Sequence, residues 1–138
     1  MSRIYFYNII SYIFIGILLL LAFWWVYPYK LMEFKNAPFP IINTIVNSGG
    51  RMVYEVDYCK YTNQSPRVTK YFIDGVVYEV NTVDGIFEKG CHKVKRDIYI
   101  PRALPVGSYS VKIVAIFTPN PIREVQYTTN TLNFTIVK

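Results

Sequence analysis

The first part of the chain is a continuous apolar segment. Ile4 to Tyr29 contains no charged residue, and Ile9 to Val26 consists almost entirely of Ile, Leu, Phe, Trp and Val. A helix needs about 20 residues to cross the hydrocarbon core of a bilayer, so this segment predicts one transmembrane helix. Aromatic residues of the interfacial type flank it, and Pro28 marks its end. The aromatic residues are Tyr5, Phe6 and Tyr7 at one end and Trp24, Trp25, Tyr27 and Tyr29 at the other.

A cleaved signal peptide is the alternative interpretation of this segment. Its apolar run is longer than the usual signal-peptide core of about 7–15 residues. Bulky residues from Phe23 to Tyr27 occupy the place where small residues would mark a cleavage site, and no cysteine near the end offers a site for lipid attachment. We therefore interpret residues 1–29 as an uncleaved anchor that contacts the lipid bilayer through residues 4–29.

Residues 30–40 are predicted to form a tether. The sequence Ala37-Pro38-Phe39-Pro40 favours an extended, stiff backbone. The remaining residues, 41–138, have the length of one β-sandwich domain.

The pattern after the tether is strand-like. From Met52, apolar residues alternate with polar ones, so Met52, Tyr54, Val56 and Tyr58 share one face of a strand. Gly49-Gly50, Asp74-Gly75 and Asn120-Pro121 indicate turns. Further strands are expected at 68–73, 76–80, 96–100 and 109–117, with a last arm from 125 to 136, and residues 81–93 are expected to form a long polar connection.

Several short strands in about 100 residues predict an all-β fold, an antiparallel β-sandwich. The predicted core contains the apolar residues of its alternating strands: Tyr54, Val56, Tyr58, Phe72, Tyr109, Val111, Ile113 and Phe134.

A short motif indicates which type of β-sandwich to expect. The stretch Ile100-Pro-Arg-Ala-Leu-Pro-Val-Gly-Ser-Tyr109-Ser-Val resembles the corner of many bacterial and phage immunoglobulin-like domains, where a Leu-Pro-x-Gly-x-Tyr run leads into a long core strand. The resemblance covers about a dozen residues and implies that Tyr109 is a corner tyrosine, with its ring in the core and its hydroxyl bonded to the loop. The whole layout also resembles small membrane-anchored proteins of tailed phages, a resemblance that implies no site residues.

The two cysteines are interpreted as a pair. Cys59 lies near the end of a predicted strand and Cys91 in the predicted long connection, so a disulfide would pin that loop to the strand; two free thiols are the alternative. A disulfide requires an oxidising compartment. Arg3 on one side of the helix and Lys30 and Lys35 on the other do not decide its orientation. We expect the N-terminus inside and the domain outside the cytoplasm, on the periplasmic or extracellular side, because the two cysteines look paired and the domain has a surface-type β-pattern.

The sequence indicates no enzyme. His92 is the single histidine, and with Cys59 and Cys91 it would make an incomplete metal site, so neither a metal nor a cofactor is expected. Glu55 and Asp57 share a strand face, whereas paired catalytic carboxylates face each other across a cleft. No phosphate-binding glycine loop or nucleophile motif is present.

The net charge is +6, and the basic excess gathers around Cys91. It predicts a candidate binding rim for an acidic surface, for lipid headgroups or for an acidic partner. The rim consists of Lys89, His92, Lys93, Lys95, Arg96 and Arg102. Nucleic acid is not expected as a partner, because the aromatic residues show no stacking motif.

Three functional hypotheses remain. The first is a non-enzymatic anchored module that binds a protein or surface glycan outside the cytoplasm, for which Ile86-Phe87 is a candidate apolar loop tip. The second is an accessory structural subunit of a larger membrane or virion assembly. The third is a phage lysis or envelope-associated factor.

Overall fold

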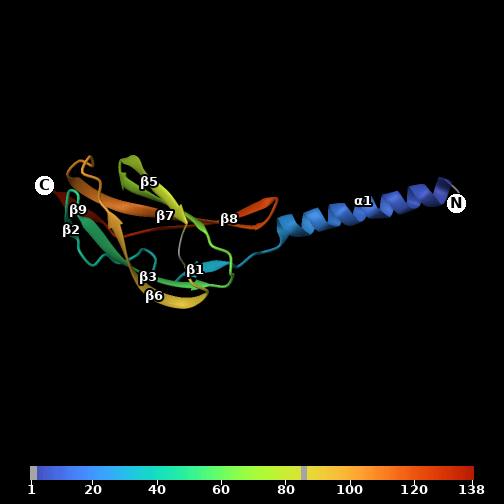
Figure 1. Cartoon of the computed structure of the whole chain (residues 1–138), viewed down its shortest axis with the longest axis horizontal. Helices are drawn as coiled ribbons and strands as arrows, with labels where there is room; N and C mark the ends of the chain where they lie inside the picture. The colour runs from blue at the N-terminus through green and yellow to red at the C-terminus, as the bar shows by residue number, and fades with distance from the viewer. Residues whose placement is uncertain (1–2, 85–86) are drawn as a thin grey trace.

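A computed structural model of the chain describes residues 3–84 and 87–138. Helix α1 (Arg3–Val26) extends from one end of a β-rich region and runs away from it (Figure 1). Its stretch Tyr5–Val26 is long and apolar enough to cross a membrane, and none of it is buried against the rest of the chain. This agrees with the predicted helix.

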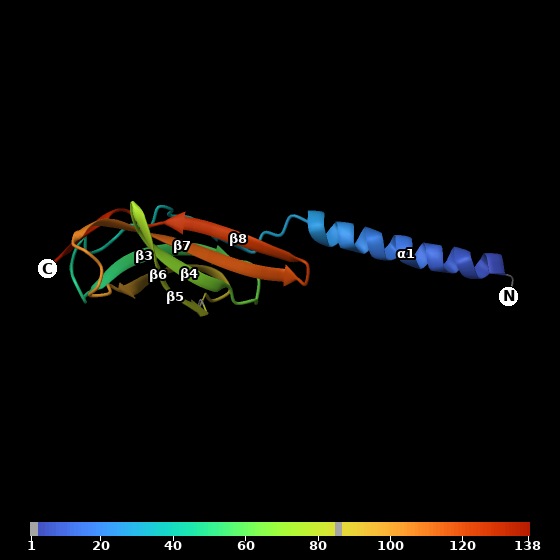
Figure 2. The same ribbon diagram turned by 90° about the horizontal axis from the view of Figure 1, so that it is seen from above.

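The β-region consists of two sheets that face each other (Figures 1 and 2). The smaller sheet has the order β1-β3-β6, and the larger has the order β2-β9-β7-β4-β5, with β8 also paired to β7. The strands are β1 (Met32–Phe34), β2 (Ile45–Asn47), β3 (Arg51–Lys60), β4 (Arg67–Asp74), β5 (Val76–Asp84), β6 (Gly90–Tyr99), β7 (Gly107–Asn120), β8 (Arg123–Asn130) and β9 (Phe134–Val137).

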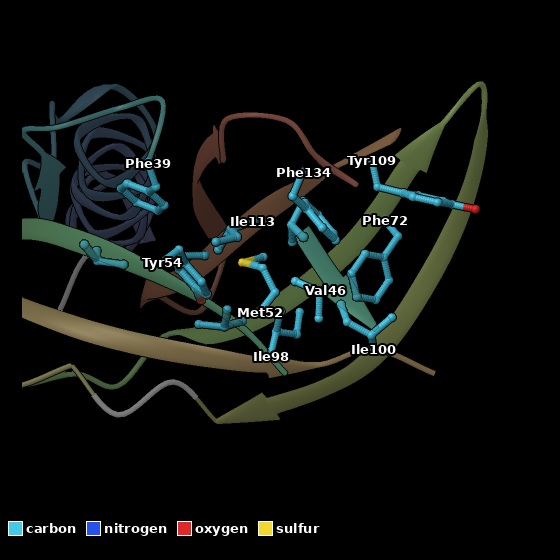
Figure 3. Packing of buried hydrophobic residues seen from close by; sticks show 14 of the residues in the cluster. Phe39, Val46, Met52, Tyr54, Phe72, Ile98, Ile100, Tyr109, Ile113 and Phe134 are labelled. Carbon is cyan, nitrogen blue, oxygen red and sulfur yellow. The ribbon is translucent and has the colours of Figure 1, made fainter. Parts of the chain in front are cut away.

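The core fills the space between the two sheets. Buried side chains from β3 and β6 meet those of β4, β7 and β9 (Figure 3). Val111 is fully buried and Ile113 is 3% exposed, which confirms the predicted register of β7. All eight predicted core residues are buried: Tyr54, Val56, Tyr58, Phe72, Tyr109, Val111, Ile113 and Phe134.

The predicted tether is instead part of the β-region. β1 lies within it and pairs with β3, with Met32 opposite Lys60. Met32 and Phe39 are each 1% exposed and belong to the core. The prediction failed because the prolines at 38 and 40 suggested a solvated spacer, whereas Phe39 between them enters the core and its N–H donates to the carbonyl of Asn130.

The predicted long polar connection over 81–93 is also wrong. β5 continues to Asp84, and β6 begins at Gly90, well before the predicted start at residue 96. The last arm, predicted from 125 to 136, is instead two strands, β8 and β9, which begin at Arg123, end at Val137 and pair with successive parts of β7. Between them Leu132 points to solvent and is 49% exposed, although its alternation suggested the core.

Candidate functional site

The disulfide joins two neighbouring strands. Cys59 of β3 and Cys91 of β6 are bonded and lie directly opposite each other in the pairing register, with their Cα atoms 4.0 Å apart. The prediction of a bonded pair is confirmed. The predicted setting is wrong, because Cys91 belongs to a strand and not to a loop. Cys59 is buried, whereas Cys91 is exposed.

The strand geometry of β6 divides the predicted basic rim. Lys93 and Lys95 lie on the outer face of the smaller sheet, whereas His92 and Arg96 alternate with them and point toward the core side. His92 and Arg96 stand opposite the buried Tyr58 and Tyr54 of β3, respectively, in the register. Because successive strand residues face opposite ways, the four side chains cannot form one rim.

Acidic residues of β3 neutralise the positive charge of the rim residues on the outer face. Lys93 Nζ lies 2.8 Å from Glu55 Oε1, and this contact raises the pKa of Lys93. Lys95 stands opposite Glu55, and Lys93 stands opposite Asp57. The outer face of this strand pair therefore carries alternating charges, which weakens the argument for an acidic partner here.

The two ends of the predicted rim are far apart. Lys89 precedes β6, and its carbonyl lies 3.0 Å from His92 Nε2. Arg102 lies beyond the other end of the strand, where its carbonyl accepts a hydrogen bond from Ser48 Oγ. Ten residues of β6 separate these ends, a length of roughly 30 Å at about 3.3 Å per residue. The six residues are thus not one site.

The segment before β6 packs against the core. The ring of Phe87 lies 4.9 Å from that of Tyr58, and the Phe87 carbonyl accepts a hydrogen bond of 2.6 Å from Lys60 Nζ. Lys60 is 3% exposed, and burial lowers its pKa. Phe87 is therefore not a free apolar loop tip, and Ile86 lies outside the described residues.

A depression of about 310 Å³ lies beside β6, the edge strand of the smaller sheet, and side chains from both faces of the strand border it. It is lined by Tyr58, Glu88, His92, Val94, Lys95 and Arg96. Glu88 lies among its basic residues, so the depression carries mixed charge. Within the described ranges 3–84 and 87–138, no three His, Cys, Asp or Glu side chains gather in a way that could hold a metal ion.

Tyr109 has the surroundings expected of a corner tyrosine. It lies near the start of β7 and is 1% exposed. Its hydroxyl donates a hydrogen bond of 2.9 Å to the carbonyl of Pro105, four residues upstream. Burial raises the pKa of Tyr109. The residue therefore packs its ring in the core and ties the start of β7 to the preceding loop.

The outer face of the larger sheet carries a depression of about 320 Å³, lined mainly by apolar residues. It is lined by Tyr71, Ile73, Val77, Lys112, Val114, Ile116 and Gln126. The side chains come from β4, β5, β7 and β8, and the register places Ile73 beside Val77. Val77 is 63% exposed. A solvent-facing sheet surface usually carries polar residues, so this face differs from the charged face of the smaller sheet.

The end of α1 is held by the turn between β7 and β8. Asn120 Nδ2 donates to the carbonyl of Trp24 at 3.2 Å. Arg123 Nη1 donates to the carbonyls of Trp25 and Tyr27, at 2.7 and 2.6 Å. The last carbonyls of a helix have no partner within it, and a cation is favourable at that end, so the turn caps α1.

Further contacts extend this junction. The Arg123 guanidinium lies over the ring of Tyr29, 5.7 Å from its centre. The Tyr127 hydroxyl donates to the carbonyl of Tyr29 at 3.3 Å and accepts from the N–H of Leu31 at 3.0 Å. Sequence analysis found the turn at Asn120-Pro121 but missed its role, because the partners are separated by more than 90 residues. In the sequence, this contact was indicated only by the positive charge of Arg123 and by the polar turn at Asn120-Pro121.

Comparisons with known proteins add no family. Neither a scan against protein-family models nor a search of curated proteins gives a match.

Proposed function

We propose that this chain is a non-enzymatic, membrane-anchored immunoglobulin-like module that binds another protein outside the cytoplasm. The apolar depression on the outer face of the larger sheet is the observation that carries the binding role. Contiguous apolar side chains on the outer face of a sheet mark interaction sites, and in this depression Val77 is exposed while Ile73 and Ile116 are half-buried. The alternating charges on the smaller sheet make its outer face a weaker candidate.

The strand order supports the immunoglobulin-like assignment. In such domains strands A, B and E share one sheet, and strands C, F and G share the other, with an added strand beside C in some types. β1, β3 and β6 correspond to A, B and E, and β5, β4 and β7 correspond to the added strand, C and F. Tyr109 near the start of β7 has the position of the corner tyrosine. The Cys59–Cys91 bond departs from the pattern, because it joins neighbours within one sheet.

The disulfide supports the proposed location, since such bonds persist in oxidising compartments. The test uses intact cells that are reduced and then treated with an impermeant alkylating reagent. Cys91 is exposed and should be labelled without permeabilisation. Labelling that requires a permeabilised inner membrane would place the domain in the cytoplasm and contradict the proposal.

The binding face is tested by site-specific photo-crosslinking in the cells that produce the protein. A photoreactive residue replaces Val77 on the larger sheet or Lys95 on the smaller sheet, both of which are exposed. We expect one discrete adduct from position 77 and none from position 95. Adding Ile73→Lys should remove the adduct, because it places a charge in the apolar depression. Equal adducts from both positions, or an adduct insensitive to Ile73→Lys, would contradict the assignment.

A further inference from the structure

The turn between β7 and β8 reaches the level of the membrane-spanning helix. Asn120 contacts the carbonyl of Trp24, which lies two residues before the end of α1 at Val26. At 1.5 Å per residue, the turn therefore extends about 3 Å past the helix end toward the bilayer. Figures 1 and 2 both show this turn as the part of the β-region nearest to α1.

This level of the helix has the composition of a membrane interface. Trp24, Trp25 and Tyr27 belong to the residue types that concentrate where headgroups meet hydrocarbon. If α1 spans a bilayer, a turn bonded to the carbonyls of these residues lies at the same depth. The depth of the turn thus follows from three hydrogen bonds rather than from its own apolar character.

The tip of the turn is suited to that layer. Pro121 and Ile122 are exposed, Ile122 by 40%. Pro121 has no N–H to desolvate, and the N–H of Ile122 donates to Asn120 Oδ1 at 3.1 Å. Unpaired backbone donors are costly in lipid, and these two residues bring none.

We propose that the β7–β8 turn is a second membrane contact of this protein, with Pro121 and Ile122 inserted at the lipid interface beside the end of α1. This inference rests on the proposed anchoring of the chain by α1. The turn would fix the tilt of the β-region against the membrane, because the protein then contacts the bilayer through α1 and through a turn that is hydrogen-bonded to the end of α1.

The test measures depth with nitroxide labels on the full-length chain in liposomes of neutral phospholipid. Single cysteines replace Ile122, Val76 or Leu19, and the protein is kept oxidised so that the native disulfide stays closed. Val76 is the matched control, since it is an apolar residue at the β4–β5 hairpin, 57% exposed, at the opposite end of the sheet. Leu19 reports on the helix itself. The ratio of collisions with oxygen to collisions with a polar nickel reagent rises with depth.

We expect the ratio at position 122 to lie between the low value at 76 and the high value at 19. A ratio at 122 equal to that at 76, together with a high ratio at 19, would overturn this inference and leave the anchor intact. Low ratios at all three positions would overturn the anchor as well. Ile122→Asp in the Pro121→Cys variant should lower the ratio at 121, and an unchanged ratio would also overturn the inference.

Discussion

Replacement of Tyr109 separates ring packing from the corner hydrogen bond. The side chain is 1% exposed, and its ring lies 6.5 Å from that of Phe72 and 6.3 Å from that of Phe134. Tyr109→Ala removes the whole ring from a closed core, and large-to-small changes of this kind cost about 3–5 kcal/mol. This is a large share of the stability of a small domain.

Tyr109→Phe keeps the ring and removes only the hydroxyl. The lost hydrogen bond to Pro105 is 2.9 Å long, and such a bond contributes about 0.5–1.5 kcal/mol. Pro105 is exposed, so its carbonyl can accept from water in the variant. The phenylalanine variant should therefore lose much less stability than the alanine variant.

The assay is urea unfolding of the full-length protein in detergent micelles, followed by near-ultraviolet circular dichroism of the tyrosines. Tyr99→Ala is the matched control, because Tyr99 is 52% exposed and surface changes usually stay within about 0.5 kcal/mol. If Tyr109→Phe proves as costly as Tyr109→Ala, the hydroxyl and not the ring stabilises the corner. If Tyr109→Ala matches the control, the core assignment is wrong.

Three further predictions concern the junction, pH and the disulfide. Arg123→Ala should speed cleavage after the exposed Lys30 by a lysine-specific protease, since the carbonyls of Trp25 and Tyr27 lose their donor; an unchanged rate would contradict the capping role. Burial raises the pKa of Tyr54 to about 12. The pKa of a tyrosine in the unfolded chain is near 10, so the free energy of unfolding should be constant below pH 10 and fall by roughly 2 kcal/mol between pH 10 and pH 12. Tyr54→Phe should flatten this decline in unfolding curves recorded across the same alkaline range. Cys59→Ser/Cys91→Ser should cost about 3–4 kcal/mol in urea unfolding by the chain-entropy estimate, and a loss below about 1 kcal/mol would contradict it.

The helix and the alternating strands could be predicted because their patterns are strong. The uncharged run before Tyr29 and the alternation from Met52 to Tyr58 each allow one structure. β6 could not be recognised in the same way. Its core-facing positions include His92 and Arg96, which an edge strand tolerates because the sheets do not close fully over it. Its sequence therefore resembled a polar loop.

The residues that join distant segments could not be predicted from the sequence. Phe39 enters the core between two prolines, and its backbone is bonded to residues near position 130. Arg123 caps a helix whose last turn is almost 100 residues earlier in the chain. Local pattern reports which face of a strand is buried, but it does not report which turn lies beside which helix end.

The junction connects α1 to both sheets. The chain leads from the helix into β1, whose Met32 pairs with Lys60 of β3, next to the disulfide that joins β3 to β6. The larger sheet reaches the same helix end through Arg123. A covalent connection alone would let the domain swing about residues 27–31, since single bonds permit rotation. Hydrogen bonds from the second sheet restrict that rotation, so the apolar face around Val77 keeps one orientation relative to α1.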